Sequence, residues 1–352
     1  MLRTDGRLVV SHVGSMVRPP AMIPYLQKAQ AGEPYDKAAF EACLTDSVIE
    51  AVRLQADAGI DAVSDGEYGK SGTWAFYVHR RLKGIEWHPF TKAEAKDPMI
   101  AVISGRDREA FPEFYAEYDA RVLAVSRSAG RPVVTAPLVY TGHAELQRDI
   151  ANLKAGLART KDVTGFLPVV APASALPNAR NEHYRDEEGF LFALAEALRI
   201  AALNHALEGM PPERTRYHIC WGSWNGPHMF DVPLKDIVDL VLEVKTGALS
   251  FEAANPRHEH EWRIWKEVRL PPGKVLMPGL IAHSTNIVEH PELVAERLIR
   301  FADCVGRDSL MAGTDCGFSQ SPLAGRVHRS IMWAKLRALA EGAAIASKRL
   351  WS

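Results

Sequence analysis

The stretch Tyr217-His218-Ile219-Cys220-Trp221-Gly222 places a histidine and a cysteine two residues apart in a short apolar run. Side chains at positions i and i+2 of a β-strand point to the same face, so His218 and Cys220 are expected to point toward one place. An imidazole and a thiolate together suit a zinc ion. Two later runs, 248–252 and 310–317, are also short and apolar, and they end near Glu252 and Cys316. The stretch therefore predicts a strand that carries part of a site completed by later strand ends.

Eight apolar runs of this kind alternate with segments of helical spacing. The expected strands are residues 8–15, 60–67, 132–137, 165–172, 217–222, 248–252, 275–283 and 310–317. The expected helices are residues 38–58, 111–128, 144–157, 187–208, 234–244, a segment with Trp262 and Trp265, 291–305 and 326–347. Apolar strands separated by helices predict a parallel sheet covered on both faces. Eight such units predict an α/β fold of the (β/α)8 TIM barrel type.

The chain is expected to form a single domain over residues 1–352, because it contains no repeat, linker or low-complexity run. Residues 82–104 interrupt the alternation after the second strand, since a tryptophan and two prolines break any helix there, and Met99–Ser104 is expected to form a hairpin arm. A doubly wound open sheet is the competing architecture. The lack of Gly-x-Gly-x-x-Gly after a strand argues against it.

Composition restricts the class of protein. The apolar fraction of 47% is ample for a large core, and the net charge of -1 gives no sign of a nucleic-acid or anionic-membrane partner. The start lacks the apolar run of a signal peptide, and no apolar run is long enough to span a membrane. Four cysteines in so long a chain do not suggest a disulfide framework. We therefore expect a soluble, cytoplasmic enzyme.

Polar side chains gather at or just after the carboxyl ends of the expected strands. In a TIM barrel the chemistry takes place at that face, which makes this coincidence the strongest argument from the residues for an active site. The residues concerned are Ser15, Asp65, Glu67, Cys220, Glu252, His283 and Cys316.

The candidate metal ligands are His218, Cys220, Glu252 and Cys316. Each alone has an ordinary structural explanation, because a lone cysteine in an apolar strand is usually a small core residue and a lone buried histidine or glutamate usually has a hydrogen-bond or ion-pair partner. Spacing alone leaves zinc and no metal equally open. With both thiolates and the carboxylate bound, the zinc ion and its ligands together carry a net negative charge. Such a zinc activates water poorly but suits a bound substrate thiolate, which points to alkyl transfer onto sulfur.

The pattern resembles the cobalamin-independent methionine synthase family, specifically its C-terminal catalytic barrel, over about residues 8–320. The matching pieces, in chain order, are His12-Val13-Gly14-Ser15 with Arg18-Pro19, Asp65-Gly66-Glu67, His218-x-Cys220, Glu252, His283-Ser284 with Asn286, and Asp315-Cys316-Gly317. Taken singly, only the His-x-Cys and Asp-Cys-Gly pieces are distinctive, whereas the ordered set is specific.

The resemblance implies a TIM barrel that holds zinc through His218, Cys220, Glu252 and Cys316. It implies that backbone groups of Gly14 and Ser15 bind the anionic end of a thiol substrate, and that Glu67 lies near its polar head. It makes His283 the proton donor to the departing group, so that His283 and Glu67 are the expected catalytic residues. Further substrate contacts are expected from Arg18, Asp65, Tyr140, Trp221 and Asn286. Members of the family move a methyl group from a 5-methyltetrahydrofolate to homocysteine.

Three departures concern how substrates are held. Val170-Ala171 stands where the family usually has Asp-Glu, and the lost aspartate grips the amino group of homocysteine, so a free α-amino acid should bind poorly. Tyr140 lies near the place of the tryptophan that stacks on folate, and Ile281 replaces an aspartate two residues before His283. The epoxyalkane–coenzyme M transferase group resembles the same barrel and uses a thiol without an amino group.

Three functions remain open. The first is a zinc-dependent thiol alkyltransferase whose partners are a small thiol and a methyl or alkyl donor such as a folate, a corrinoid protein or an epoxide. The second is a metal-free decarboxylase of the uroporphyrinogen type, in which Arg18, Arg80 and Arg81 bind a polycarboxylate. The third is a non-catalytic binding barrel. A homo-oligomer is compatible with each. The run His258-Glu259-His260-Glu261 is interpreted as a solvated helix start rather than a metal cluster.

Overall fold

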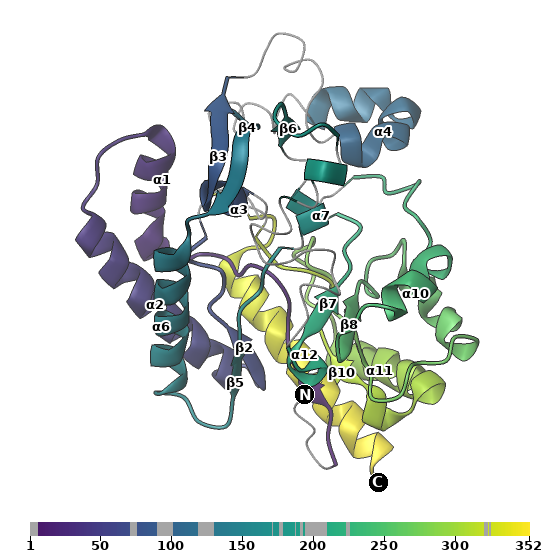
Figure 1. The fold of residues 1–352 in the computed structure, drawn as a ribbon. Coiled ribbons are helices and arrows are strands. Elements are labelled where there is room, and N and C mark those ends of the chain that lie inside the picture. The colour runs from purple at the N-terminus through teal and green to yellow at the C-terminus, as the bar shows by residue number, and fades with distance from the viewer. Residues whose placement is uncertain are drawn as a thin grey trace.

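The computed structural model describes residues 6–70, 76–89, 101–118, 130–170, 172–175, 179–186, 188–190, 193, 210–222, 226–319, 323 and 325–352. Within these ranges the chain is an α/β protein, in which helices surround short strands (Figure 1). The strands of the main parallel series are β1 Val9–Val10, β2 Ala62–Ser64, β5 Thr164–Phe166, β7 Arg216–His218, β8 Ala248–Phe251, β9 Val275–Pro278 and β10 Met311–Ala312.

These strands lie side by side in one parallel series, β5-β2-β1-β10-β9-β8-β7. Regular pairing joins β1 to β10, β2 to β5, β7 to β8 and β8 to β9. Single parallel bridges, Ser11 to Ala62 and Leu276 to Leu310, join β1 to β2 and β9 to β10. Among the described strands no pair joins β5 to β7, so the closure of an eight-stranded barrel stays a prediction.

Alternation of side chains gives the series an outer and an inner face. The outer face packs against the helices and contributes Leu8, Val10, Leu249, Phe251, Leu276 and Ala312 to the main core. The inner face forms a separate apolar cluster of Val9, Val13, Ala248, Val275, Met277 and Met311. Arg216 of β7 donates to Ser11 Oγ beside β1 at 2.9 Å, and its guanidinium lies 4.2 Å from the ring centre of Phe166 in β5. The two ends of the series therefore approach each other across the inner face, as they do in a barrel.

Five long helices cover the outer face. They are α2 Lys37–Asp57, α6 His143–Leu157, α10 Leu234–Leu242, α11 Pro291–Val305 and α12 Arg329–Leu350. Local capping explains several of the starts: Asp36 Oδ1 accepts from the Ala39 N–H at 3.0 Å, and His290 and His328 accept backbone N–H groups in the same way. A side-chain acceptor at this position satisfies an N–H group that has no partner within the helix. The predicted helices in these five places are confirmed, with small shifts at their ends.

The shorter elements complete the description. They are η1 Pro20–Met22, α1 Ile23–Ala31, α3 Phe76–Arg80, β3 Leu82–His88, α4 Ala101–Ala110, β4 Arg131–Tyr140, α7 Pro172–Ala175, β6 Arg180–Asn181, η4 Pro212–Arg214, η5 Glu259–Lys266 and η6 Arg307–Ser309.

The third predicted barrel strand is wrong. Residues 132–137 lie within β4, which pairs antiparallel with β3 and parallel with β6 in a separate sheet. β5 lies directly beside β2, so residues 164–166 form the third strand of the parallel series in chain order. The predicted hairpin arm Met99–Ser104 is wrong, because residues 101–104 begin α4. The insertion after β2 instead contains the antiparallel pair of β3 and β4, which we call the hairpin although α4 lies between its two arms in the chain. The apolar run of β4 fits this position because its Val134 and Leu138 are buried in a separate small core that Leu82 of β3 also joins.

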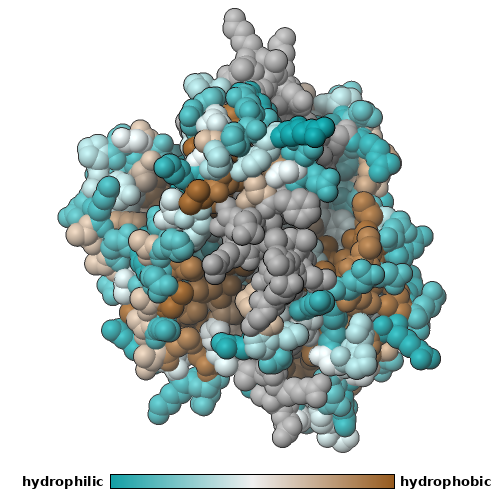
Figure 2. Space-filling view, viewed as in Figure 1, coloured by the Kyte–Doolittle hydropathy of each residue, from teal (hydrophilic) through white to brown (hydrophobic). Residues whose placement is uncertain are grey.

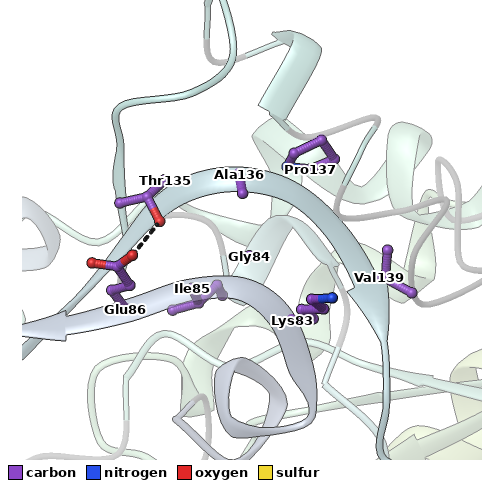
Figure 3. A pocket seen from close by; sticks show the side chains of 8 residues that line it. All are labelled: Lys83, Gly84, Ile85, Glu86, Thr135, Ala136, Pro137 and Val139. Atoms are coloured by element: carbon purple, nitrogen blue, oxygen red, sulfur yellow. Dashed lines mark hydrogen bonds between the residues drawn. The ribbon is translucent and has the colours of Figure 1, made fainter.

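A cavity of about 440 Å³ opens between the two arms of this hairpin (Figure 3). At the bulge, Gly84 has a φ of 91°, and a Cβ there would lie 2.5 Å from the Pro137 carbonyl oxygen. The Thr135 hydroxyl donates to Glu86 Oε1 at 3.2 Å across the arms. None of the expected site residues lines this cavity, so it is separate from the candidate site.

The run after β8 also differs from its predicted form. Residues 259–266 make a 3-10 helix rather than an α-helix. The interpretation of residues 258–261 as a solvated start is wrong, because His258 and Glu261 are buried while His260 is exposed. The helix expected over 111–128 is helical at 112–118, and that expected over 187–208 is helical at 188–190 and 193; the remaining residues of both lie outside the described part.

The surface mixes hydrophilic and hydrophobic residues on the face drawn in Figure 2, where hydrophobic areas lie at the lower left and at the right. Among large apolar side chains, Val169, Leu240 and Ile287 are well exposed. In the portion of the chain that the structure describes, no helix combines the length and the apolar character needed to cross a membrane.

Candidate metal centre and its surroundings

The inner face of β7 leads directly to a cluster of sulfur and nitrogen atoms. The side chains of His218, Cys220 and Cys316 each offer a ligand atom, and these three atoms lie within 4.8 Å of one another. His218 Nδ1 is hydrogen-bonded to Ser250 Oγ of β8 at 3.0 Å, whereas its Nε2 is buried without a hydrogen-bond partner. A histidine that binds a metal usually makes a hydrogen bond through one ring nitrogen and binds the metal through the other.

A hydrogen bond joins the two sulfurs, with the Cys220 thiol as the donor. The pKa of Cys220 is held well above the usual thiol value and that of Cys316 well below it, because the Cys220 thiol donates to the Cys316 sulfur. His218 and His283 add to the stabilisation of the Cys316 thiolate. A divalent cation replaces such thiol protons on binding. Two sulfurs and an imidazole nitrogen that lacks a partner therefore form a donor set that fits zinc.

Glu252, the fourth expected ligand, lies in an adjoining group. Its carboxylate and the side chains of His283 and Asp315 also bring ligand atoms within 4.8 Å of one another, and all three residues are buried. Glu252 Oε1 accepts the Trp221 N–H at 3.1 Å, and Oε2 accepts from Asn255 Nδ2 at 2.8 Å. The structure thus brings three of the four expected ligands into one cluster and places the fourth in the neighbouring one.

His283 and Asp315 each have buried polar atoms without a hydrogen-bond partner. Both ring nitrogens of His283 lack one, as does Asp315 Oδ2, whereas Asp315 Oδ1 accepts from the backbones of Ala253 and Ala254 at 2.8 and 2.9 Å. Burial lowers the pKa of His283. Burial and the nearby Glu252 carboxylate raise the pKa of Asp315 well above its usual value. The sequence interpretation assigned no role to Asp315, although its place directly before Cys316 was a usable signal.

The loops after β1 and β10 meet backbone to backbone at the edge of this region. Gly14 has a φ of 66°, and a Cβ there would lie 2.9 Å from Gly317 Cα. The Ser15 carbonyl oxygen accepts the N–H groups of Phe318 and Ser319 at 2.8 and 3.2 Å. Only glycine permits both the left-handed backbone and this close approach. The expected substrate-binding loop at Gly14 and Ser15 is therefore fixed against the loop that carries Cys316.

A buried polar group surrounds Glu67, whose φ of 58° places it in a tight turn after β2. Its carboxylate accepts from the Ser15 hydroxyl and, at 2.7 Å, from Lys70 Nζ, while its carbonyl oxygen accepts from Arg18 Nη2 at 2.8 Å. Burial acts to raise the pKa of Glu67, but Lys70, Ser15 and Arg18 outweigh it and hold the pKa below the usual value. Burial raises the pKa of the neighbouring Asp65 to about 6. Sequence reasoning missed Lys70, although its spacing of three residues from Glu67 fits a partner across one turn.

Three other expected substrate contacts lie apart from these clusters or have other partners. Tyr140 ends β4 and donates through its hydroxyl to the Gly142 carbonyl at 3.0 Å. The indole of Trp221 stacks on the ring of His258, with the ring centres 4.1 Å apart. The exposed Asn286 amide binds the backbones of residues 326 and 328. Their roles toward a substrate stay predictions.

The chain is similar in sequence and in fold to proteins with known names. It is 25% identical over an alignment of 395 residues, covering 98% of this chain and 96% of the other, to 2-hydroxypropyl-CoM lyase of Xanthobacter autotrophicus. It is 24% identical to the uncharacterized protein YxjH of Bacillus subtilis, covering 93% and 91% of the two chains. No protein-family profile matches it.

Two solved structures share the fold over nearly the whole chain. A B12-independent methionine synthase from Shewanella sp. W3-18-1, in complex with selenomethionine, aligns with a TM-score of 0.72 at 19% identity over 97% of this chain and 99% of the other. A protein from Listeria monocytogenes described as a vitamin-B12-independent methionine synthase aligns with a TM-score of 0.64 at 16% identity, covering 99% and 100%. The resemblance indicated by the motifs is thereby confirmed: the chain has the fold of the B12-independent methionine synthases, and its sequence is similar to that of a lyase named for a coenzyme M thioether.

Proposed function

We propose that the protein is a zinc-dependent thiol alkyltransferase. The observation that carries the proposal is the convergence of Cys220 Sγ, Cys316 Sγ and the His218 nitrogen that has no partner. A buried imidazole nitrogen without a hydrogen bond costs free energy unless a ligand binds it. Similarity over nearly the full length to a 2-hydroxypropyl-CoM lyase, and in fold to a B12-independent methionine synthase, agrees with this choice.

His218, Cys220 and Cys316 would hold the zinc, and Glu252 would provide the fourth, harder ligand from the adjoining group. Zinc bound by these residues would keep a substrate thiol deprotonated near neutral pH while leaving its sulfur nucleophilic. The hydrogen bond to Ser250 keeps the His218 ring directed at the sulfurs. The backbone N–H of Trp221 orients the Glu252 carboxylate. Glu252 is the one oxygen donor of the four, whereas Cys220, Cys316 and His218 would supply the softer ligands.

His283 is the proton donor in this proposal. Its ring is 3% exposed and forms no hydrogen bond. The protonated ring can therefore transfer a proton to a leaving atom without first losing a hydrogen bond within the protein. Burial disfavours the charged ring, while Cys316 and Glu252 favour it. Proton transfer of this kind typically contributes about 10²–10⁴-fold to a rate.

The thiol in this proposal lacks an α-amino group. Glu67, the carboxylate expected near the substrate's polar head, is already paired with Lys70 at 2.7 Å. Val170 stands where a second carboxylate would be needed, and its backbone N–H is bound to the Tyr77 hydroxyl. An ammonium group would therefore find no uncompensated carboxylate at these two positions. This favours a thiol such as coenzyme M over homocysteine.

The metal-free alternative has less support. Arg18 donates to the Glu67 carbonyl oxygen, and Arg81 is paired with Asp149 at 2.7 Å. Two of the three arginines that a polycarboxylate would need thus already have partners within the chain. We also propose that the parallel series closes into a barrel that forms one domain over the whole chain.

Metal analysis of the purified protein and of single cysteine variants tests the proposal. Cys220→Ser and Cys316→Ser should lose zinc and activity together, whereas the matched control Cys43→Ser, in helix α2, should keep both. Coenzyme M should shift the sulfur-to-metal charge-transfer band of cobalt-substituted protein, and homocysteine should shift it little. Full zinc content in both site variants would refute the ligand assignment, and a response to homocysteine alone would refute the choice of thiol.

A further inference from the structure

Four ionisable side chains outside the candidate site form a buried network that we call the histidine cluster. Its members are His228, Asp231, His258 and Glu261. His258 is 3% exposed and is bonded through Nδ1 to Glu261 Oε2 at 2.9 Å and through Nε2 to Asp231 Oδ2 at 3.0 Å. Asp231 Oδ2 also receives His228 Nδ1 at 2.8 Å. The cluster therefore joins the loop after β7 to the start of η5.

The ring of His258 is an imidazolium. A carboxylate only accepts hydrogen bonds, so a histidine bonded to one carboxylate at each nitrogen must donate from both. Burial by itself lowers the pKa of His258, but the bonds to Asp231 and Glu261 outweigh it and raise the pKa to about 9. The cation lies against the indole of Trp221, with ring centres 4.1 Å apart and the planes inclined by 25°. A cation on the face of an indole is a favourable contact.

Trp221 is the middle residue of the turn that follows Cys220. Its indole N–H donates to the Val232 carbonyl at 2.6 Å, so the side chain is fixed both at its face and at its edge. The backbone of the same turn supplies two donors: the Trp221 N–H to Glu252 Oε1 at 3.1 Å, and the Gly222 N–H to Cys220 Sγ at 3.2 Å. Both acceptors belong to expected metal ligands. Fixing the Trp221 side chain therefore fixes the two N–H groups that orient a carboxylate and a sulfur.

We infer that His258 is a positioning residue for the metal centre, acting through its stack on Trp221 to hold the turn whose N–H groups orient Glu252 and Cys220. The inference rests on the proposed function, because it concerns the same zinc site. His258 touches neither zinc nor substrate, so its effect is on the affinity and geometry of the site. Partners that orient metal ligands in this way typically change metal affinity or activity by about 10–100-fold when they are lost.

The test compares zinc affinity, measured by competition with a chromophoric chelator, between two histidine variants two residues apart. His258→Phe keeps an aromatic ring on Trp221 but removes the charge and both hydrogen bonds, and we expect zinc to bind about 10–100-fold more weakly. The carboxylates keep other partners, His228 for Asp231 and the Leu234 N–H for Glu261 at 2.7 Å, which favours a folded variant. His260→Phe alters an exposed residue of the same run and should bind zinc as the wild type does.

A second variant covers a failure of His258→Phe to fold. Asp231→Asn keeps an oxygen acceptor but removes one carboxylate, and it should weaken zinc binding in the same direction and alter the charge-transfer band of cobalt-substituted protein. If His258→Phe folds and binds zinc as tightly as the wild type, the inference is overturned and the proposed function stays intact. If only Asp231→Asn folds, unchanged zinc affinity in that variant has the same meaning. Failure of the wild type itself to bind zinc would overturn both, and it would be seen before any variant is compared.

Discussion

Lys70 Nζ donates to Glu67 Oε1 at 2.7 Å within a single turn, and both side chains are buried. The chain thus supplies its own ammonium group to the carboxylate expected to meet the substrate's polar head. Lys70→Met should leave that carboxylate unpaired and able to accept an ammonium group from a ligand. We expect the affinity for homocysteine to rise relative to that for coenzyme M by about 10-fold or more, the scale of one charge-assisted hydrogen bond.

The measurement for Lys70→Met is a titration of cobalt-substituted protein with each thiol. The control is Lys83→Met, an exposed lysine on the hairpin. The variant should also unfold at a lower temperature, because removing one partner of a buried ion pair leaves an uncompensated charge. An unchanged preference between the two thiols in a folded variant would show that Glu67 does not take part in recognising them.

The loop that carries His283 depends on a buried ion pair from α12. Lys335, which is fully buried, donates to Glu289 Oε2 at 2.6 Å and to the Ile287 carbonyl, and Glu289 Oε1 accepts the Ala282 N–H at 2.8 Å. Because the His283 ring forms no hydrogen bond, this contact beside its backbone helps to set its position. Lys335→Met leaves the Glu289 carboxylate without its buried cation, so it should lower the free energy of unfolding by about 3–5 kcal/mol.

An exposed ion pair involving the same helix provides the comparison. Arg349 of α12 donates to Glu292 of α11 at 2.7 Å, and both side chains are nearly half exposed. Arg349→Met should cost about 0–1 kcal/mol. Urea unfolding of both variants measures the difference, and at temperatures where Lys335→Met stays folded its turnover should fall while its zinc content is kept. Equal stability losses in the two variants would contradict the role given to the buried pair.

How far the sequence predicts this structure depends on whether the signal is local. The helix 291–305 is predicted with its bounds, because a proline at the first helical position is a local feature. The strand expected over 275–283 is found at 275–278, because apolar continuity marks a buried run but not where the strand ends. The run 132–137 is apolar as well, but its partner β3 lies in an insertion, and no local pattern shows whether an apolar strand pairs with the sheet or with a hairpin.

The candidate site follows the same rule. Alternation along the predicted strand 217–222 puts His218 and Cys220 on one face, but β7 ends at His218, so Cys220 lies in the segment that follows the strand. The two side chains still approach Cys316, as expected where the carboxyl ends of parallel strands meet. Lys70 and His258 were missed because their burial depends on contacts between segments distant in the chain. Lys70 reaches the Pro168 carbonyl at 2.5 Å, and His258 reaches Asp231 from a different loop.

The histidine cluster predicts a dependence of stability on pH. The pKa of His258 is raised to about 9 in the folded protein, above its ordinary value of 6.5. A raised pKa means that the folded state holds its proton more tightly, so the contribution is fully present below pH 6.5 and is lost as the pH rises through about 9. The loss should be on the order of 3 kcal/mol. His258 faces Asp231, Glu261 and, through Asp231, His228, and its two carboxylate partners hold the His258 proton in place.

Urea unfolding at pH 6.5 and at pH 9.5 measures this effect for the wild type and for His258→Phe. The wild type should lose more stability between the two values than the variant, which lacks the titrating group. His260→Phe should follow the wild type, because the exposed His260 has no such partners in the described structure. Parallel curves for the wild type and His258→Phe would contradict an imidazolium at this position.

The contact between Gly14 and Gly317 predicts a difference between two glycines of similar backbone conformation. Gly14 has a φ of 66° and Gly32 a φ of 71°, but a Cβ at Gly14 would lie 2.9 Å from Gly317 Cα, whereas a Cβ at Gly32 would meet nothing within 4 Å. Gly32→Ala should therefore cost only the left-handed backbone, about 1–2 kcal/mol. Gly14→Ala should cost clearly more and should also reduce thiol binding, because the loops that carry Ser15 and Cys316 must move apart. Urea unfolding measures the loss of stability of both variants, and thiol titration measures their thiol affinity. Equal stability losses with unchanged thiol affinity would mean that the approach of the two loops does not constrain the site.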